Sequence, residues 1–96
     1  MTKETIIELL RKDLPYLKNT FGVQTIGLFG SYSKNENTNN SDLDFFVEVD
    51  KPLAKNYFGL WNYLEKKFNN KIDLIRKGPH LREKFLKTVE KEIIYA

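Results

Sequence analysis

The chain has 96 residues, of which 41% are hydrophobic and none is cysteine. A chain of this length suits one domain with one core, and the lack of cysteine excludes disulfides and thiolate metal sites. Its 16 Lys and Arg residues against 13 Asp and Glu give a net charge of +3. This mild excess is spread along the chain and does not predict direct nucleic-acid binding. We therefore expect a single domain over residues 1–96.

The apolar segments are too short for a membrane protein. None approaches the roughly 20 residues that a transmembrane helix requires. The N-terminal segment carries charges within an amphipathic pattern, which is not the pattern of a secretory signal. We expect a cytoplasmic protein with no membrane partner.

The first predicted element is a core-facing helix from residue 2 to about residue 21. Its apolar residues recur at spacings of three and four, with charged residues on the other side. They are Ile6, Ile7, Leu10, Leu14, Leu17 and Phe21. Pro15 lacks an amide donor, so we expect a kink or a restart of the helix near residues 13–15. Gly22 is expected to end the helix.

Two strands are predicted next, separated by a polar segment. Residues 23–30 are short, β-rich and bounded by glycines, and residues 33–40 hold four Asn and no apolar side chain, which predicts a strand and then a loop or single helical turn. In residues 42–49, alternate side chains point to opposite faces. One face carries Leu43, Phe45, Val47 and Val49, and the other carries Asp42, Asp44, Phe46 and Glu48. We expect the first face to be core and the second to be mostly acidic.

The second half of the chain predicts a helix, a strand and a helix. Residues 50–52 should end the second strand and open a helix from Leu53 to about residue 69. A turn at residues 69–71 leads to a short strand over residues 72–75, with Asp73 in its middle. Gly78-Pro79 precedes a last helix from about His80 to Ile93. The predicted class is α+β, with a small mixed sheet of three to four strands packed against helices and carboxylates exposed on one side.

Two aspartates of the second predicted strand form the candidate catalytic centre. Asp42 and Asp44 lie two residues apart, so their carboxylates project from one face and can share one or two hard cations, for which Mg²⁺ is the best fit. Side by side, they repel each other and raise one pKa unless a cation or a donor compensates them. The short third strand can bring Asp73 alongside, which gives three carboxylates around one point.

Gly30-Ser31 can supply a phosphate-binding half of the same site. Glycine lets the backbone approach a phosphate closely, and the Ser31 hydroxyl and the amides of the following turn can donate to its oxygens. Carboxylates and phosphate donors together are what a two-metal phosphoryl or nucleotidyl transfer requires. In such a site the ions bridge the phosphates, neutralise developing charge and lower the pKa of the attacking hydroxyl.

The pattern of Gly30-Ser31, ten intervening residues and Asp42-Leu-Asp44 resembles the minimal nucleotidyltransferases of the DNA polymerase β superfamily. The resemblance extends to residues 72–75 and 82–96, so it covers nearly the whole chain and implies a polymerase β-like nucleotidyltransferase fold. It implies that Asp42, Asp44 and Asp73 are catalytic metal ligands, with Asp73 helping to deprotonate the acceptor hydroxyl. It also implies that Gly30 and Ser31 bind the triphosphate of the nucleotide.

The chain departs from this family at one motif. Many members carry Ala-Arg-Gly shortly after the Gly-Ser pair, where this chain has Ser33-Lys34-Asn35. Lys34 can keep the positive charge for nucleotide binding, and Asn35 tolerates a left-handed backbone better than most residues.

The resemblance implies a nucleotidyltransferase that uses two Mg²⁺ ions to move AMP from ATP to an acceptor hydroxyl. Larger relatives carry an extra helical domain for the acceptor, and no residues remain here to build one. Stand-alone members of this size resemble the antitoxin half of two-gene modules whose partner is a helical HEPN ribonuclease. This implies a hetero-oligomer in which AMP is transferred to a tyrosine hydroxyl of that partner.

Two other functions stay open at this point. One is a non-catalytic antitoxin that occludes its partner, with Trp61 and Phe58 or the basic helices as contact surface. The other is a small-molecule nucleotidyltransferase of the aminoglycoside type. The position of Trp61 and Phe58 beside the helix stripe nevertheless favours a core role for both.

His80 is more typical of a surface or capping residue than of a ligand. Arg76 and Lys77 are expected to be solvated but within reach of a substrate phosphate near Asp73.

Overall fold

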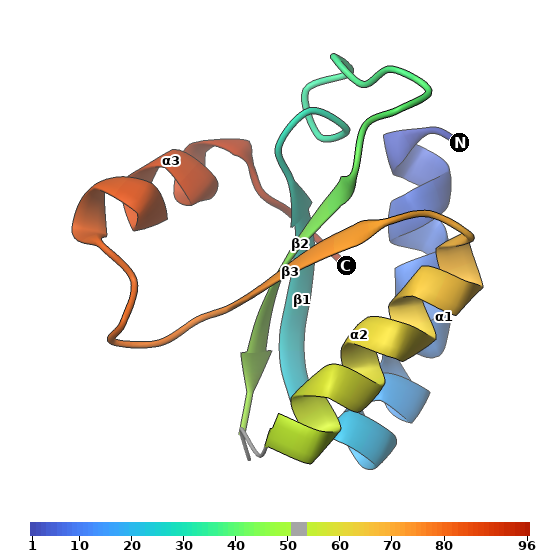
Figure 1. Cartoon of the computed structure of the whole chain (residues 1–96), viewed down its shortest axis with the longest axis vertical. Coiled ribbons are helices and arrows are strands. Elements are labelled where there is room, and N and C mark those ends of the chain that lie inside the picture. The colour runs from blue at the N-terminus through green and yellow to red at the C-terminus, as the bar shows by residue number, and fades with distance from the viewer. Residues whose placement is uncertain (51–53) are drawn as a thin grey trace.

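The computed structural model describes residues 1–50 and 54–96, and it holds one sheet with helices on both of its faces (Figure 1). The elements in chain order are α1 (Lys3–Phe21), β1 (Val23–Phe29), β2 (Leu43–Val49), α2 (Ala54–Phe68), β3 (Ile72–Arg76), α3 (Glu83–Glu92) and β4 (Ile94–Tyr95). The predicted α+β class and the sheet of three to four strands are confirmed. The expected helix start at Leu53 and the preceding Lys51 and Pro52 lie outside the described residues.

The sheet is mixed, with the strand order β3-β2-β1-β4. β1 runs antiparallel to both β2 and β4, whereas β2 and β3 are parallel. Parallel neighbours need a crossover connection, and α2 provides it between β2 and β3. The parallel register places Asp73 directly beside Asp44, which decides where the predicted carboxylates meet.

The main core lies between the sheet and the layer formed by α1 and α2. Odd-numbered residues of β2 point into it because strand side chains alternate. Phe45 is fully buried in this core, to which α1 contributes isoleucines and leucines and α2 contributes leucines. The other face of the sheet carries α3 (Figure 1). Under α3, Phe29, Phe46 and Val89 form a smaller cluster. α3 thus covers part of the face that the sequence predicts to be acidic.

α1 is one continuous helix, so the predicted restart near residues 13–15 is wrong. Pro15 lies on the exposed side of α1, where water can bond the carbonyl group that loses its amide partner. Asp13, on the inner side, accepts a hydrogen bond from the Tyr63 hydroxyl at 2.5 Å and pairs with Lys67 at 3.3 Å, which ties α1 to α2 across this segment. The helix ends at Gly22 as predicted, with φ at 72°.

α3 begins at Glu83 rather than near His80. The preceding residues form a turn in which the Leu81 amide donates to the Gly78 carbonyl at 3.2 Å, and the extended backbone at Arg82, with ψ at 142°, separates this turn from the helix. His80 is exposed, as expected of a surface residue. The helix ends at Glu92, and the next residues add a short strand, β4, to the edge of β1. Within residues 1–50 and 54–96, none of the helices combines the length and hydrophobicity that crossing a bilayer requires.

Side chains of α2 close the outer edge of β3. The Tyr57 hydroxyl donates to the Leu74 carbonyl, and Trp61 Nε1 donates to the Ile72 carbonyl at 2.9 Å. These bonds occupy backbone groups that an edge strand otherwise leaves open to another chain. Trp61 therefore has the predicted core role, but Phe58 is 60% exposed and the core prediction for it is wrong.

Candidate active site

The structure brings the three predicted aspartates to one face at the start of β2 and β3. Asp44 and Asp73 are register partners on parallel strands, which lie roughly 4.8 Å apart in any sheet. Asp42 directly precedes β2 and is exposed, as is Asp73, whereas Asp44 is half-buried. Within the part of the chain that the structure describes, no three acidic or imidazole side chains lie close enough together to hold a metal ion. The backbone therefore brings the three aspartates to one face, but their carboxylate groups are not gathered around one point.

Asp44 is the carboxylate that the surroundings change most. Burial, followed by the negative charges of Asp73, Asp42 and Glu92, raises the pKa of Asp44 from 3.8 to about 6. Each of these causes penalises the ionised form. The negative charges of the four carboxylates therefore oppose one another, and the three aspartates among them offer the hard oxygen ligands that a divalent cation prefers. Asp42, Asp44 and Asp73 are the residues that would hold Mg²⁺ here.

Gly30 lies between Asp44 and the polar turn that follows β1. Its φ is 75°, a left-handed conformation that a side chain would strain. A Cβ at residue 30 would also lie 2.2 Å from Oδ2 and 3.0 Å from Cγ of Asp44, so the Asp44 side chain would have to move. The backbone at Gly30 therefore passes directly against the central carboxylate, and the conformation and the contact together favour glycine there.

The segment after Gly30 is a tight turn held by its own polar groups. The Ser33 amide and the Ser33 hydroxyl both donate to the Gly30 carbonyl, at 3.1 and 2.7 Å, and Ser33 is buried. The Ser31 carbonyl accepts from the amides of Lys34 and Glu36. Asn35 has a φ of 58°, a left-handed conformation that asparagine tolerates better than most residues. The bonds of Ser33 escaped sequence analysis, although a serine in a turn often bonds nearby backbone.

A fourth carboxylate belongs to the site, and sequence analysis missed it. Glu92, the last residue of α3, accepts a hydrogen bond from the Gly30 amide through Oε2 at 3.1 Å. Its Oε1 pairs with Nζ of Lys34 at 3.3 Å. The Glu92 side chain is only 18% exposed. Gly30 and Glu92 are 62 residues apart in sequence, and a glutamate near a helix end gives no signal of such a contact.

Of the two basic residues expected to be solvated, Lys77 is exposed and Arg76 is half-buried. Lys77 is exposed, as predicted, and pairs with Glu48 at 3.9 Å. Arg76 is half-buried at the end of β3. Burial raises the pKa of Tyr57, and the charges of Arg76 and Asp73 act on it in opposite directions. By strand alternation, Arg76 lies on the face of β3 opposite to Asp73.

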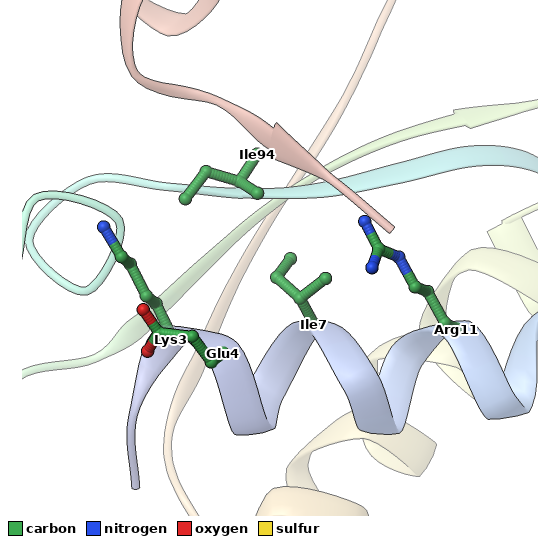
Figure 2. A pocket seen from close by; sticks show the side chains of 5 residues that line it. All are labelled: Lys3, Glu4, Ile7, Arg11 and Ile94. Atoms are coloured by element: carbon green, nitrogen blue, oxygen red, sulfur yellow. The ribbon is translucent and has the colours of Figure 1, made fainter.

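A separate surface cavity of about 270 Å³ lies where α1 meets β4. Figure 2 shows Lys3, Glu4, Ile7, Arg11 and Ile94 around it, with the nitrogen ends of Lys3 and Arg11 directed away from the helix axis. It lies on the α1 side of the sheet, because Ile7 and Ile94 belong to the main core. None of these five residues belongs to the aspartate face.

Residues 11–96 match the polymerase β nucleotidyltransferase family. The chain is also 40% identical over 97 aligned residues to a candidate protein adenylyltransferase of Methanocaldococcus jannaschii. That alignment covers 98% of this chain and 97% of the archaeal protein. Both comparisons span most of the chain, including all the site residues described above.

Several solved structures are similar to this chain, and they include two that contain a toxin and an antitoxin. A toxin–antitoxin structure with AMP-PNP is 26% identical, with a TM-score of 0.69, and the likeness covers 99% of this chain and 72% of the other. A Shewanella oneidensis structure of a tri-AMPylated HEPN toxin with its MNT antitoxin is 24% identical, with a TM-score of 0.59, covering 97% of this chain and 66% of the other. The second likeness shows the fold alone. From the family match and its agreement with the fold, this chain belongs to the polymerase β nucleotidyltransferase family.

Proposed function

We propose that this protein is a Mg²⁺-dependent protein adenylyltransferase and the antitoxin of a HEPN ribonuclease toxin. The observation that carries the proposal is the juxtaposition of Asp44 with Asp73 on one side and with the Gly30 backbone on the other. Family membership, the protein adenylyltransferase relative and the AMP-PNP-bound toxin–antitoxin structure support it. The proposal includes a cytoplasmic location, because the proposed substrate ATP is available there.

The proposed reaction transfers AMP from ATP to a tyrosine hydroxyl of the partner toxin. The tyrosine oxygen attacks the α-phosphorus, the bond from that phosphorus to the bridging oxygen breaks, and pyrophosphate leaves with the bond's electron pair. Mg²⁺, when bound, neutralises charge that develops on the phosphates. Asp73 takes the tyrosine proton, a role for which its position beside Asp44 is suitable.

Gly30, Ser31 and Lys34 are the proposed nucleotide-binding residues. The Gly30 amide and the Lys34 ammonium both bind the carboxylate of Glu92, so the two groups already act together as anion donors. The Gly30 backbone also lies directly against Asp44. Nucleotidyl transfer needs such an arrangement, in which phosphate donors lie next to the metal ligands.

The test replaces Asp42 and Asp44 together by Asn. The double variant should fold and should fail to add AMP to the purified partner with ATP and Mg²⁺, measured as the mass increase of the partner. The matched control is Asp50→Asn, which changes an exposed residue beyond the end of β2. Retained transfer in the double variant would reject the proposed function.

A second function has one observation in its favour. Phe58 is 60% exposed on α2 and lines a surface hollow together with Trp61, so a partner could contact two aromatic side chains there. A non-catalytic antitoxin would bind no ATP with Mg²⁺ in calorimetry and would still block the ribonuclease. Turnover with a free sugar alcohol would instead favour a small-molecule nucleotidyltransferase.

A further inference from the structure

Glu92 occupies an anion site made by this chain. One of its carboxylate oxygens accepts the Gly30 amide at 3.1 Å and the other pairs with the Lys34 ammonium at 3.3 Å. A carboxylate held by a backbone amide and a cation is a charge-assisted arrangement. With a side chain 18% exposed, Glu92 is shielded from the water that would otherwise weaken these bonds.

The two donors that hold Glu92 are among those proposed for the triphosphate. The Gly30 amide has one hydrogen to donate, so it cannot fully serve Glu92 and a phosphate oxygen at once. Lys34 can hold two anions, and it already lies 3.9 Å from Glu36 as well as 3.3 Å from Glu92. A phosphate arriving at this turn therefore meets a carboxylate already bound there.

The charge of Glu92 also opposes a phosphate directly. Like charges held a few ångströms apart repel strongly where water is partly excluded. Glu92 acts on the charge of Asp44 as well, which places it within range of both halves of the site. If it stayed in place, the bound nucleotide would face a fourth carboxylate that no proposed metal ligand set uses.

The backbone beside Glu92 is held firmly, so its side chain is the part that can move. A Cβ at Gly27 would lie 2.6 Å from Cγ1 of Ile93, which shows how closely this junction packs on β1. Ile94 pairs with Leu28 immediately afterwards. A rotation of the Glu92 side chain is enough to release both donors.

We propose that Glu92 is a resident carboxylate that holds the phosphate donors of the free protein and is exchanged for a phosphate group when the nucleotide binds. The inference rests on the proposed function for the identity of the ligand. It makes Glu92 a specificity-determining residue. A highly charged triphosphate displaces the carboxylate more effectively than a monophosphate does, because it brings more charge to the same donors.

The experiment measures binding of inorganic tripolyphosphate, without metal, to the full chain by calorimetry. Glu92→Gln keeps an acceptor for the Gly30 amide and removes the charge, and it should bind tripolyphosphate about three- to tenfold more tightly than the wild type. Glu90→Gln is the matched control, since it makes the same change at an exposed residue of the same helix, and it should change affinity less than twofold. Adding Lys34→Ala to Glu92→Gln should remove the gain.

Equal or weaker binding by Glu92→Gln would overturn the inference, as would no measurable tripolyphosphate binding by any variant. An unchanged thermal melt of Glu92→Gln shows that the comparison concerns the site and not the fold. If Glu92→Gln binds tripolyphosphate more tightly but the wild type transfers no AMP to the toxin, the proposed function is rejected and the anion exchange is kept. If the wild type transfers AMP but Glu92→Gln has unchanged affinity for tripolyphosphate, the anion exchange is rejected and the proposed function is kept.

Discussion

Gly30 and Asp44 are in such close contact that a Cβ at residue 30 would force the central carboxylate of the site to move. The missing Cβ would lie 2.2 Å from Asp44 Oδ2, and the φ of 75° adds backbone strain to the collision. Gly30→Ala should therefore destabilise the protein by about 1–2 kcal/mol and weaken nucleotide binding. Chemical denaturation and calorimetry with ATP measure the two effects.

Gly59→Ala is the control for that substitution. Gly59 lies inside α2, and a Cβ there would meet the ring of Phe21, with Cε1 at 3.2 Å and Cδ1 at 3.9 Å, while alanine favours a helix over glycine. It should leave nucleotide binding unchanged. Equal losses of binding in both variants would show that Gly30 has no special part in the site.

Asp44→Asn should stabilise the metal-free protein at neutral pH. The folded state raises the pKa of Asp44 from 3.8 to about 6, so the folded protein binds the proton more tightly than the unfolded chain does. Stability is therefore lost as the pH rises from about 4 to about 6, and it stays lost above that range. Asn removes the loss.

Melting temperatures measured from pH 3.5 to 8 test this expectation. Asp44→Asn should melt higher than the wild type at pH 7, and the difference should vanish below pH 4. Asp50→Asn makes the same change at an exposed position and should show no such profile. A gain that is equally large at every pH would contradict the electrostatic explanation.

Mg²⁺ should raise the melting temperature of the wild-type protein. A ligand that binds only the folded state stabilises it by an amount that grows with the ratio of free ligand concentration to Kd, and the cation also relieves the repulsion at Asp44. Asp42→Asn with Asp44→Asn should abolish the shift, because two of the three proposed ligands are lost. An equal ionic strength of NaCl is the control, and a shift of the same size with NaCl would argue against a specific site.

Asp73→Asn should slow AMP transfer by about 10²-fold or more, the usual contribution of a general base. The melting temperature should change little because Asp73 is exposed on β3. Single-turnover transfer to the partner toxin, with ATP in excess, measures the effect. Asp73→Glu keeps a carboxylate and should recover part of the rate, and full activity in Asp73→Asn would remove it from the mechanism.

Trp61→Phe should destabilise the protein by about 1 kcal/mol. It removes the donor to the Ile72 carbonyl, leaving that edge group of β3 to water, and a neutral hydrogen bond contributes about this much. Denaturant unfolding gives the free energy of unfolding. Phe58→Ala, at an exposed residue one turn earlier on α2, should have little effect on stability, and equal losses would refute the role of the indole donor.

The amino-acid sequence by itself determined the local features of this protein. Alternation along β2 separates Phe45 from Asp44, because successive strand side chains point to opposite faces. Helical spacing predicts the buried face of α1, and the Gly-Ser and Asp-Leu-Asp spacing indicates the family, which the match over residues 11–96 confirms. These features depend on neighbouring residues, so they are visible without a fold.

Only the tertiary structure decided which distant groups meet. The parallel register of β2 and β3 sets Asp73 beside Asp44, and a shift of one residue would have turned Asp73 to the other face. The packing of α3 brings Glu92 to the Gly30 amide, 62 residues away. Pro15 also stays within α1 because contacts with α2 hold that segment. Each outcome depends on how elements pack across the chain, and local patterns do not encode it.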